Sequence, residues 1–149
     1  MAATYQSAVC ANIAPAKIPT GSNLAAVRGS VSVLDTLALN ETMQMVPLPA
    51  GCVPVDVILD TDDLDSSTGI VLAVGILTSA LSDLESGQNF ITGSTIAQTG
   101  GIARMDQKAG GRLAVNNTTT RYVGVKVTTA ATGTKAAGTV GVTLIYRNA

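Results

Sequence analysis

The sequence predicts an all-β protein, a β-sandwich or jelly roll with an extended N-terminal arm. In several stretches apolar and polar residues alternate with a period of two, the pattern of strands that bury one face. Gly, Pro, Asn and Asp separate these stretches at short intervals, as turns between strands do. Residues 70–77 are apolar on both faces, which indicates a central strand. Seven or eight short strands with little helix fit two packed sheets.

The chain is expected to divide into an extended arm at residues 1–26 and a β-sandwich domain at residues 27–149. The arm has no sustained apolar period, and Pro15 and Pro19 disfavour a helix there. Segments of this kind commonly order only against a neighbouring molecule. The alternatives are a free tail or an edge strand that the arm adds to its own sheet.

Up to residue 112 the domain is expected to consist mainly of strands. In chain order, the pattern predicts strands at 27–34, 43–46, 53–60 and 70–77, one or two helical turns at 79–85, a short strand opening at Phe90 and a Gly-rich polar loop at 98–112. Met43 and Met45 share one strand face and are interpreted as core side chains. Pro54 indicates an edge position or the start of its strand.

The C-terminal third has the clearest pattern, two alternating runs at 121–129 and 140–146 around a polar loop at 130–137. We expect a β-hairpin that ends the domain. Its inward residues should face one another across one buried layer: Val123, Val125 and Val127 in the first run, and Val140, Val142 and Leu144 in the second. Lys126 lies on the opposite face and should tolerate substitution if it is exposed to solvent.

Charge is segregated along the chain. No Lys or Arg occurs between Arg28 and Arg104, and this interval holds nine of the ten acidic residues, although the net charge is only −1. The folded molecule could present opposite potentials on different patches, which suits self-complementary assembly. Alternatively, folding brings the segments together and intermixes the charges. Charged residues are 13% of the chain, a low share that indicates a surface used for protein contacts.

Composition argues against an enzyme. The chain has no histidine, which excludes Ser-His-Asp triads and His-dependent metal sites, and it has no phosphate-binding glycine motif. We therefore predict no catalytic residue and no cofactor. The two cysteines are far apart, which fits free thiols in a reducing cytoplasm. Dispersed basic residues without interleaved aromatics predict no nucleic-acid partner, and the longest apolar run is too short to cross a membrane.

Asp60, Asp62, Asp63 and Asp65 crowd one predicted turn and are the weak candidates for a metal site. Carboxylates on one short loop can bind Ca²⁺, but this loop lacks the complete EF-hand spacing. The favoured interpretation is an exposed turn in which the Asp side chains accept hydrogen bonds from nearby backbone amides. No metal is predicted from this loop.

Several stretches of the β-domain together resemble small virion structural proteins of tailed bacteriophages. They are residues 45–51 (MVPLPAG), 55–60 (VDVILD), 62–66 (DDLDS), 90–94 (FITGS), 97–101 (AQTGG) and 138–147 (GTVGVTLIYR). The resemblance covers about residues 27–147. Several proteins of this group are capsid decoration, or cement, proteins. The resemblance implies a β-rich domain that is oligomeric on the shell and has no catalytic residues.

The resemblance implies a capsid decoration protein, which binds the outer surface of the major capsid protein lattice and stabilises the head. Its expected partners are the major capsid protein and further copies of itself, as a dimer or trimer. Its expected place is the exterior of the virion, after synthesis in the host cytoplasm. Two alternative functions stay open: a phage tail or head-fibre component that binds the host surface, and a calcium-dependent carbohydrate-binding module that uses the Asp60 to Asp65 loop.

Overall fold

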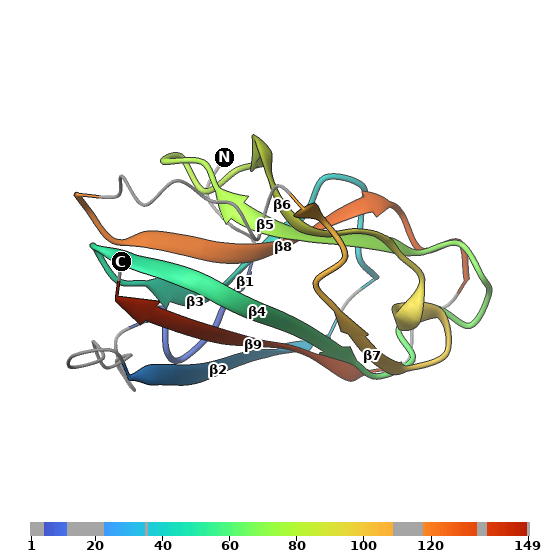
Figure 1. Cartoon of the computed structure of the whole chain (residues 1–149). Coiled ribbons are helices and arrows are strands. Elements are labelled where there is room, and N and C mark those ends of the chain that lie inside the picture. Colours follow the sequence, from blue (N-terminus) through green and yellow to red (C-terminus); the bar gives the residue numbers. More distant parts are fainter. Residues whose placement is uncertain (1–4, 12–22, 35, 109–117, 134–136, 149) are drawn as a thin grey trace.

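Two β-sheets packed face to face make up the computed structural model (Figure 1), which describes residues 5–11, 23–34, 36–108, 118–133 and 137–148. Sheet A has the strand order β1-β3-β8-β5-β6, and sheet B has the order β2-β9-β4-β7. The strands are β1 Tyr5–Gln6, β2 Leu24–Val33, β3 Thr42–Leu48, β4 Cys52–Thr61, β5 Val71–Leu77, β6 Leu84–Ser94, β7 Gly101–Arg104, β8 Arg121–Thr129 and β9 Gly138–Asn148, with a 3-10 turn, η1 Ile96–Gln98, before β7. The predicted class, an all-β sandwich, is confirmed.

The core lies between the sheets and is built from alternating residues of their strands. In β9 the inward residues Val140, Val142, Leu144 and Tyr146 are fully buried, whereas Arg147 is exposed. Burying a Val or Leu side chain stabilises a fold by roughly 1.5–3 kcal/mol. The period-two pattern therefore fixes which face of each strand turns inward.

The predicted C-terminal hairpin is wrong, because β8 and β9 belong to opposite sheets. β8 pairs with β3 and β5 in sheet A, and β9 pairs with β2 and β4 in sheet B. The connection between them crosses from one sheet to the other, and its residues 134–136 lie outside the described part of the chain. The inward residues are nevertheless correct, since Val125 and Val142 both belong to the buried core. Alternation determines the face of a strand but not its hydrogen-bonded neighbour.

β3 is buried on both faces, which explains the methionines at its centre. Met43 and Met45 are fully buried, as predicted. The register of β3 against β8 shifts between Gln44 and Val46, and this β-bulge lets the adjacent residues Met45 and Val46 both be buried. Unbranched, flexible methionine suits the irregular space beside a bulge.

A second bulge corrects one detail of the strand predicted at 53–60. The register of β4 against β9 shifts between Pro54 and Asp56. Val55, which strict alternation would place on the inward face with Val53 and Val57, is 40% exposed. Pro54 lies near the start of β4, before the residues that pair with β7, so β4 pairs with β9 alone at that point. This position agrees with the expectation for a proline in a sheet.

The helical turns predicted at 79–85 are wrong. β6 already begins at Leu84, so the strand around Phe90 is longer than predicted. Leu81 has a φ of +59°, a left-handed backbone conformation that does not continue a right-handed helix. A tight turn therefore joins β5 to β6.

The loop predicted at 98–112 is partly regular. Residues 101–104 form β7, which pairs with β4 at the edge of sheet B. Gly100 precedes this pairing and Gly101 begins it, with φ values of +76° and +152°, conformations that favour glycine. Residues 109–112 of the predicted loop lie outside the described part of the chain.

The described part of the N-terminal segment lies on the chain's own sheet. β1 pairs in parallel with β3, and the backbone N–H of Ser7 donates to the carbonyl of Gln44 at 2.9 Å. The Ser7 hydroxyl donates to the Met45 carbonyl, and Gly29 of β2 has no side chain at this point of close approach. β2 begins at Leu24, three residues before the predicted domain boundary, and residues 12–22 are outside the described part.

Candidate functional site

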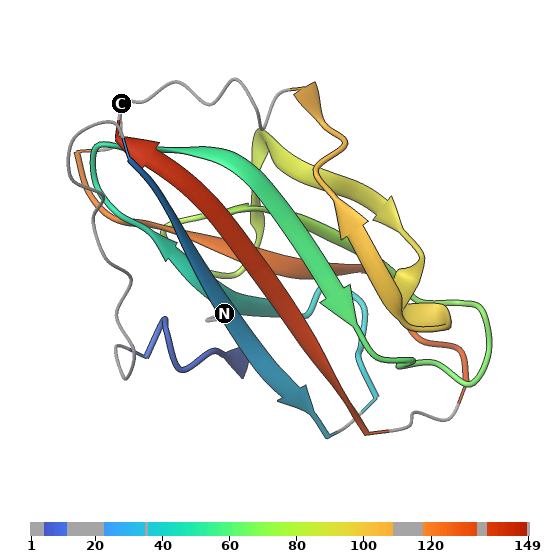
Figure 2. The ribbon, with the colours of Figure 1, turned by 60° about the horizontal axis from the view of Figure 1, so that its bottom comes forward.

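The outer face of sheet B is a surface formed by four neighbouring strands. Figure 2 shows β2, β9, β4 and β7 side by side, with no other described strand in front of β2, β9 and β4. Val57 and Leu59 of β4 point into the core, so Ile58 and Asp60, which alternate with them along the strand, point outward. The register places Ile58 beside Thr143 of β9, in the same outward row. We call this surface the outer face of sheet B.

An ion pair lies flat across this face. Arg28 on β2 donates from Nε to Asp60 Oδ1 at 3.2 Å and from Nη2 to Asp60 Oδ2 at 2.5 Å. The hydrogen bond with Asp60 raises the pKa of Arg28. Between β2 and β4 lies Gly141 of β9, where an added Cβ would be 2.6 Å from Asp60 Oδ1. The absence of a side chain at Gly141 therefore makes room for the pair.

The charges that are segregated in the sequence are intermixed in the fold. Four ion pairs join described residues: Arg28 to Asp60, Arg104 to Asp56, Arg121 to Glu85, and Lys126 to Asp83. Each pair joins an acid from the interval between Arg28 and Arg104 to a base at its boundary or beyond. The reason is topological, since neighbouring strands of each sheet come from distant parts of the chain. Of the two interpretations of the charge pattern, these contacts support intermixing.

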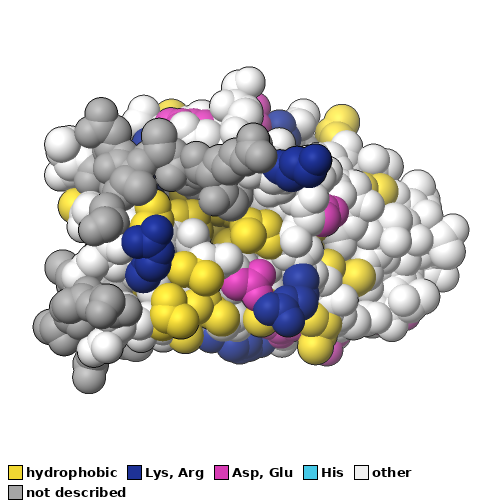
Figure 3. All heavy atoms as spheres, viewed as in Figure 1, with side chains coloured by type: hydrophobic (Ala, Val, Ile, Leu, Met, Phe, Trp, Pro, Cys, Tyr) yellow, Lys and Arg dark blue, Asp and Glu magenta, His cyan; other side chains and the backbone are white. Residues whose placement is uncertain are grey.

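Exposed apolar side chains stand among these charges. The large ones in the described part of the chain are Leu24, Leu34, Leu39, Val55 and Ile102, and Ile102 on β7 is 70% exposed. Arg147 of β9 pairs with Leu24 on one side and with Val53 on the other, which brings Leu24 and the bulge at Val55 to one end of sheet B. Figure 3 shows hydrophobic side chains gathered in the half of the molecule that holds the C-terminus, with charged side chains among them.

The acidic segment from Asp60, near the end of β4, to Asp65, in the loop that follows, has a structural role and does not form a metal-ligand cluster. Asp60 binds Arg28, Asp62 Oδ2 accepts from the backbone N–H of Thr139 at 2.7 Å, and Asp63 Oδ1 accepts from the backbone N–H of Asp65 at 3.2 Å. The carboxylates thus engage different partners in the fold. No group of three or more Asp, Glu, Cys or His side chains that could hold a metal ion occurs among the described residues.

Asp65 differs from the exposed turn residue that the sequence predicts, because it is almost fully buried. Its two oxygens accept from five backbone N–H groups and one hydroxyl: Ser67 N, Ser67 Oγ and Gly133 N on Oδ1, and Gly69 N, Ile70 N and Thr132 N on Oδ2. Burial by itself raises the pKa of Asp65, but the backbone hydrogen bonds outweigh it and hold the pKa well below its usual range. The carboxylate joins the β4–β5 connection to the β8–β9 connection.

Sequence reasoning found the acidic loop but missed how it is used. The prediction that Asp side chains accept bonds from backbone amides is correct for Asp62, Asp63 and Asp65. The partners of Asp65 at 132 and 133 are distant in sequence, so no local pattern could reveal them. The role of Gly141 could not be predicted from local sequence either, because Arg28 and Asp60, the side chains that need its missing Cβ, are distant in sequence.

The fold is a two-sheet β-sandwich, and comparisons with solved structures find the same fold in other chains. No family model and no curated protein matches the chain. A chain in the capsid of Ralstonia phage GP4 matches with a TM-score of 0.82 and 29% identity, over 97% of both chains. A chain of the cyanophage Pam1 capsid asymmetric unit matches with a TM-score of 0.66 and 29% identity, over 91% of this chain and 92% of the other.

Both structural neighbours are chains of bacteriophage capsids. The resemblance to small phage virion structural proteins is therefore confirmed, now over nearly the whole chain. The likeness supports a structural role in the virion, in an assembly with other capsid components. Among the described residues, no helix has the length and apolar character needed to span a bilayer.

Proposed function

We propose that this chain is a bacteriophage capsid decoration protein without catalytic activity. It binds the outer surface of the major capsid protein lattice as a dimer or trimer and stabilises the head. The observation that carries the proposal is the likeness to a chain of the Ralstonia phage GP4 capsid over 97% of both chains. The acidic loop takes no part in this function, since its carboxylates are engaged within the fold.

The complete core supports the proposal that this protein folds by itself and is then added to a shell. Both sheets contribute fully buried residues to one core, so the sandwich can fold before it meets a partner. Exposed Leu24, Val55 and Ile102 then offer apolar area for contact with the lattice. Binding to the assembled lattice but not to free subunits stabilises the assembly by linkage, and many copies on one lattice add avidity.

A tail or head-fibre component remains the second candidate, and both structural neighbours favour the head because they come from capsids. Copy number per particle separates the two, because a decoration protein covers the lattice whereas a tail part occurs in few copies. Calcium titration of the purified protein addresses the carbohydrate-binding alternative. Carbohydrate binding that requires Ca²⁺ would favour that alternative.

The test uses heads of the encoding phage assembled without this protein. Purified protein is mixed with these heads, which are pelleted, imaged and heated. We expect many copies on the outer surface and a higher temperature of shell disruption. Ile102→Asp and Leu24→Asp should weaken binding, while Ser86→Asp, at an exposed position of β6 in sheet A, serves as the control. Heads that bind no protein, or carry it only at one vertex, contradict the proposal.

A further inference from the structure

The outward positions of three neighbouring strands in sheet B, β2, β9 and β4, have the composition of a protein contact surface. These positions carry no Lys and no Glu, and their acids, Asp56 and Asp60, are each bound by an arginine. Surfaces buried between proteins are enriched in Arg and depleted in Lys and Glu. The outward residues are Leu24, Ala26, Arg28, Ser30 and Ser32 on β2, Thr139, Gly141, Thr143, Ile145 and Arg147 on β9, and Val55, Asp56, Ile58 and Asp60 on β4.

The centre of this face is neutral and partly apolar. The register places Thr143 of β9 between Arg28 and Ile58, and Ile145 lies one row further along the same strand. Ile58 and Ile145 are only half-buried, so both still present apolar surface to solvent. The nearest charges, Arg28 and Asp60, are bound to each other. Charges that are already paired are the kind that proteins tolerate under a contact.

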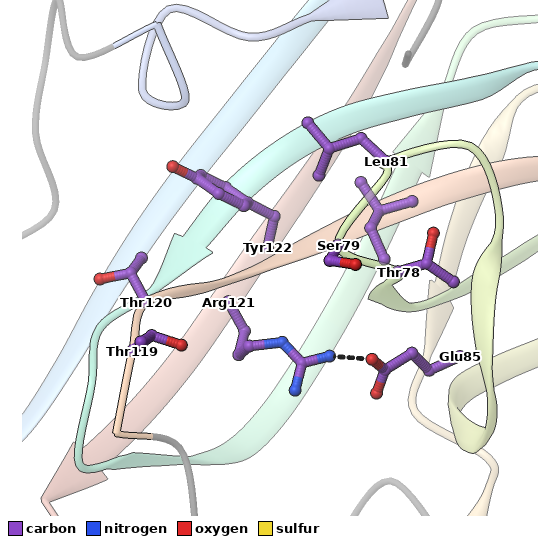
Figure 4. Close-up of a pocket in the computed structure, with 9 residues that line it drawn as sticks. Thr78, Ser79, Leu81, Glu85, Thr119, Thr120, Arg121 and Tyr122 are labelled. Atoms are coloured by element: carbon purple, nitrogen blue, oxygen red, sulfur yellow. Dashed lines mark ion pairs between the residues drawn. The ribbon is translucent and has the colours of Figure 1, made fainter. Parts of the chain in front are cut away.

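The outer face of sheet A is less open, because the turn between β5 and β6 lies across it. Thr42 Oγ1 on β3 donates to the Leu81 carbonyl of this turn at 2.9 Å, so the turn crosses β8 to reach β3. Beside the turn, near the start of β8, lies a pocket that holds the Arg121–Glu85 ion pair (Figure 4). By contrast, none of the described strands lies in front of β2, β9 and β4 (Figure 2). Sheet B therefore offers the more accessible face.

The arrangement of charge on this face favours a second copy of the chain as the partner. Arg28 lies on β2 and both acids lie on β4, on opposite sides of β9. A twofold axis that runs along β9, between two facing sheets, would set β2 of each copy against β4 of the other. The strand with the base then faces the strand with the acids in both halves of the contact. At the axis β9 meets β9, where Gly141, Thr143 and Ile145 present small or apolar groups.

The ends of such a contact suit the remaining residues. Aligned sheets that pack face to face cross at about 30°, so their ends diverge. Arg147, at the end of β9, is exposed, and its long side chain can extend into solvent there. Leu24 and Val55 of both copies lie at this same end of the pair. Ile102 lies outside the contact, because β7 is the strand beyond β4.

The area of the face fits a weak dimer. β2, β9 and β4 contain 10, 11 and 10 residues. With about 4.8 Å between strands and about 3.3 Å per residue, the three strands cover roughly 14 Å by 33 Å. Two such faces bury roughly 900 Å² when counted as flat, which is near the lower limit for a specific contact. We therefore expect a dissociation constant on the order of 100 µM, which the high local concentration on a shell would offset.

We infer that the outer face of sheet B joins two copies of this chain in a twofold dimer, through β2, β9 and β4. The inference deepens the proposed function, which names a dimer or a trimer without a surface, and rests on it only for the role of the dimer on the head. There the end that carries Leu24 and Val55 of both copies, together with Ile102, is left to contact the lattice.

The test is analytical ultracentrifugation of the purified whole protein, from roughly a tenth to ten times the expected dissociation constant. The unmodified protein should pass from monomer to dimer over this range. Thr143→Asp places two unpaired carboxylates opposite each other near the axis, so it should raise the dissociation constant at least about tenfold. Ser86→Asp adds the same charge at an exposed position of β6 in sheet A and should dimerise like the unmodified protein. Thermal melts should show that both variants are folded.

A second measurement maps the contact without any substitution. In two-dimensional amide NMR, concentrating the unmodified protein should shift the signals of Ile58, Thr143 and Ile145, while those of Tyr122 and Lys126 in sheet A stay constant. The inference is overturned if the protein is monomeric throughout the range, if folded Thr143→Asp dimerises normally, or if the shifts fall on sheet A. Since no capsid is used, these outcomes are separate from failure of the protein to bind heads.

Discussion

The carboxylate of Asp65 accepts a 2.8 Å hydrogen bond from the backbone N–H of Gly133, which lies 68 residues further along the chain. The same side chain binds Ile70 N at 2.9 Å, so one buried charge joins two loops that connect different pairs of strands. A carboxylate has two acceptor oxygens, and the fold uses both of them.

Asp65 should make stability depend on pH in the acidic range. Because its pKa in the folded state lies below the unfolded value of about 3.9, the charged form stabilises the fold at any pH above that value. The contribution is lost as pH falls below about 4 toward the folded pKa. Thermal melts from pH 7 down to pH 2 should show that Asp65→Asn is less stable at pH 7 and loses less on acidification. Asp63→Asn, an exposed neighbour, is the control, and equal pH profiles for Asp65→Asn and the unmodified protein would contradict the argument.

Gly141 should be required for the ion pair between Arg28 and Asp60. In Gly141→Ala the new methyl group would overlap both side chains, so the pair must separate. We expect a loss of about 1 kcal/mol in the free energy of unfolding, the upper part of the range for partly exposed ion pairs. A double-mutant cycle with Arg28→Ala, measured by urea unfolding, checks the cause. The cost of Gly141→Ala should shrink when Arg28 is absent; an undiminished cost would mean that the backbone, not the pair, is affected.

Gly29 should be required for the contact between β2 and β3. A side chain there would collide with the Met45 carbonyl and would lie 2.7 Å from the Ser7 hydroxyl. Gly29→Ala should therefore destabilise the fold by about 2–3 kcal/mol, as overpacking of a tight interior does. Ser30→Ala, at the exposed next residue of the strand, should change stability by less than about 0.5 kcal/mol. Similar melting temperatures for the two variants would show that β2 and β3 can separate without cost.

The inward rows of β8 and β9 should not accept charge. Val125→Asp or Val142→Asp would place an unpaired carboxylate in the core, at a cost of several kcal/mol, about 3–5. Thr143→Asp, on the outer face beside Val142, should remain folded. Lys126 is a poor control, because it is only partly exposed and pairs with Asp83. Thermal melts decide the matter, and a normal melting temperature for Val142→Asp would contradict the position of β9.

The sequence by itself determined the class of fold and the direction in which most side chains point. Alternation in β9 correctly selected Val140, Val142 and Leu144 as core residues, because a strand turns successive side chains to opposite faces whatever its neighbours are. It also excluded histidine chemistry and identified the acidic loop. Where β-bulges interrupt the ladder, as at Val55, the rule failed, since one extra residue reverses the alternation.

Only the tertiary structure decided which strands are partners and what the charged residues do. β8 and β9 are consecutive strands and yet lie in different sheets, because pairing depends on how two whole sheets bury their faces rather than on the loop between them. The same non-local pairing brings Arg28 to Asp60, places Gly141 between them and gathers donors from two loops around Asp65. Local pattern sets which face a residue takes, whereas contacts between distant segments set its partner, and those contacts exist only once the sandwich has formed.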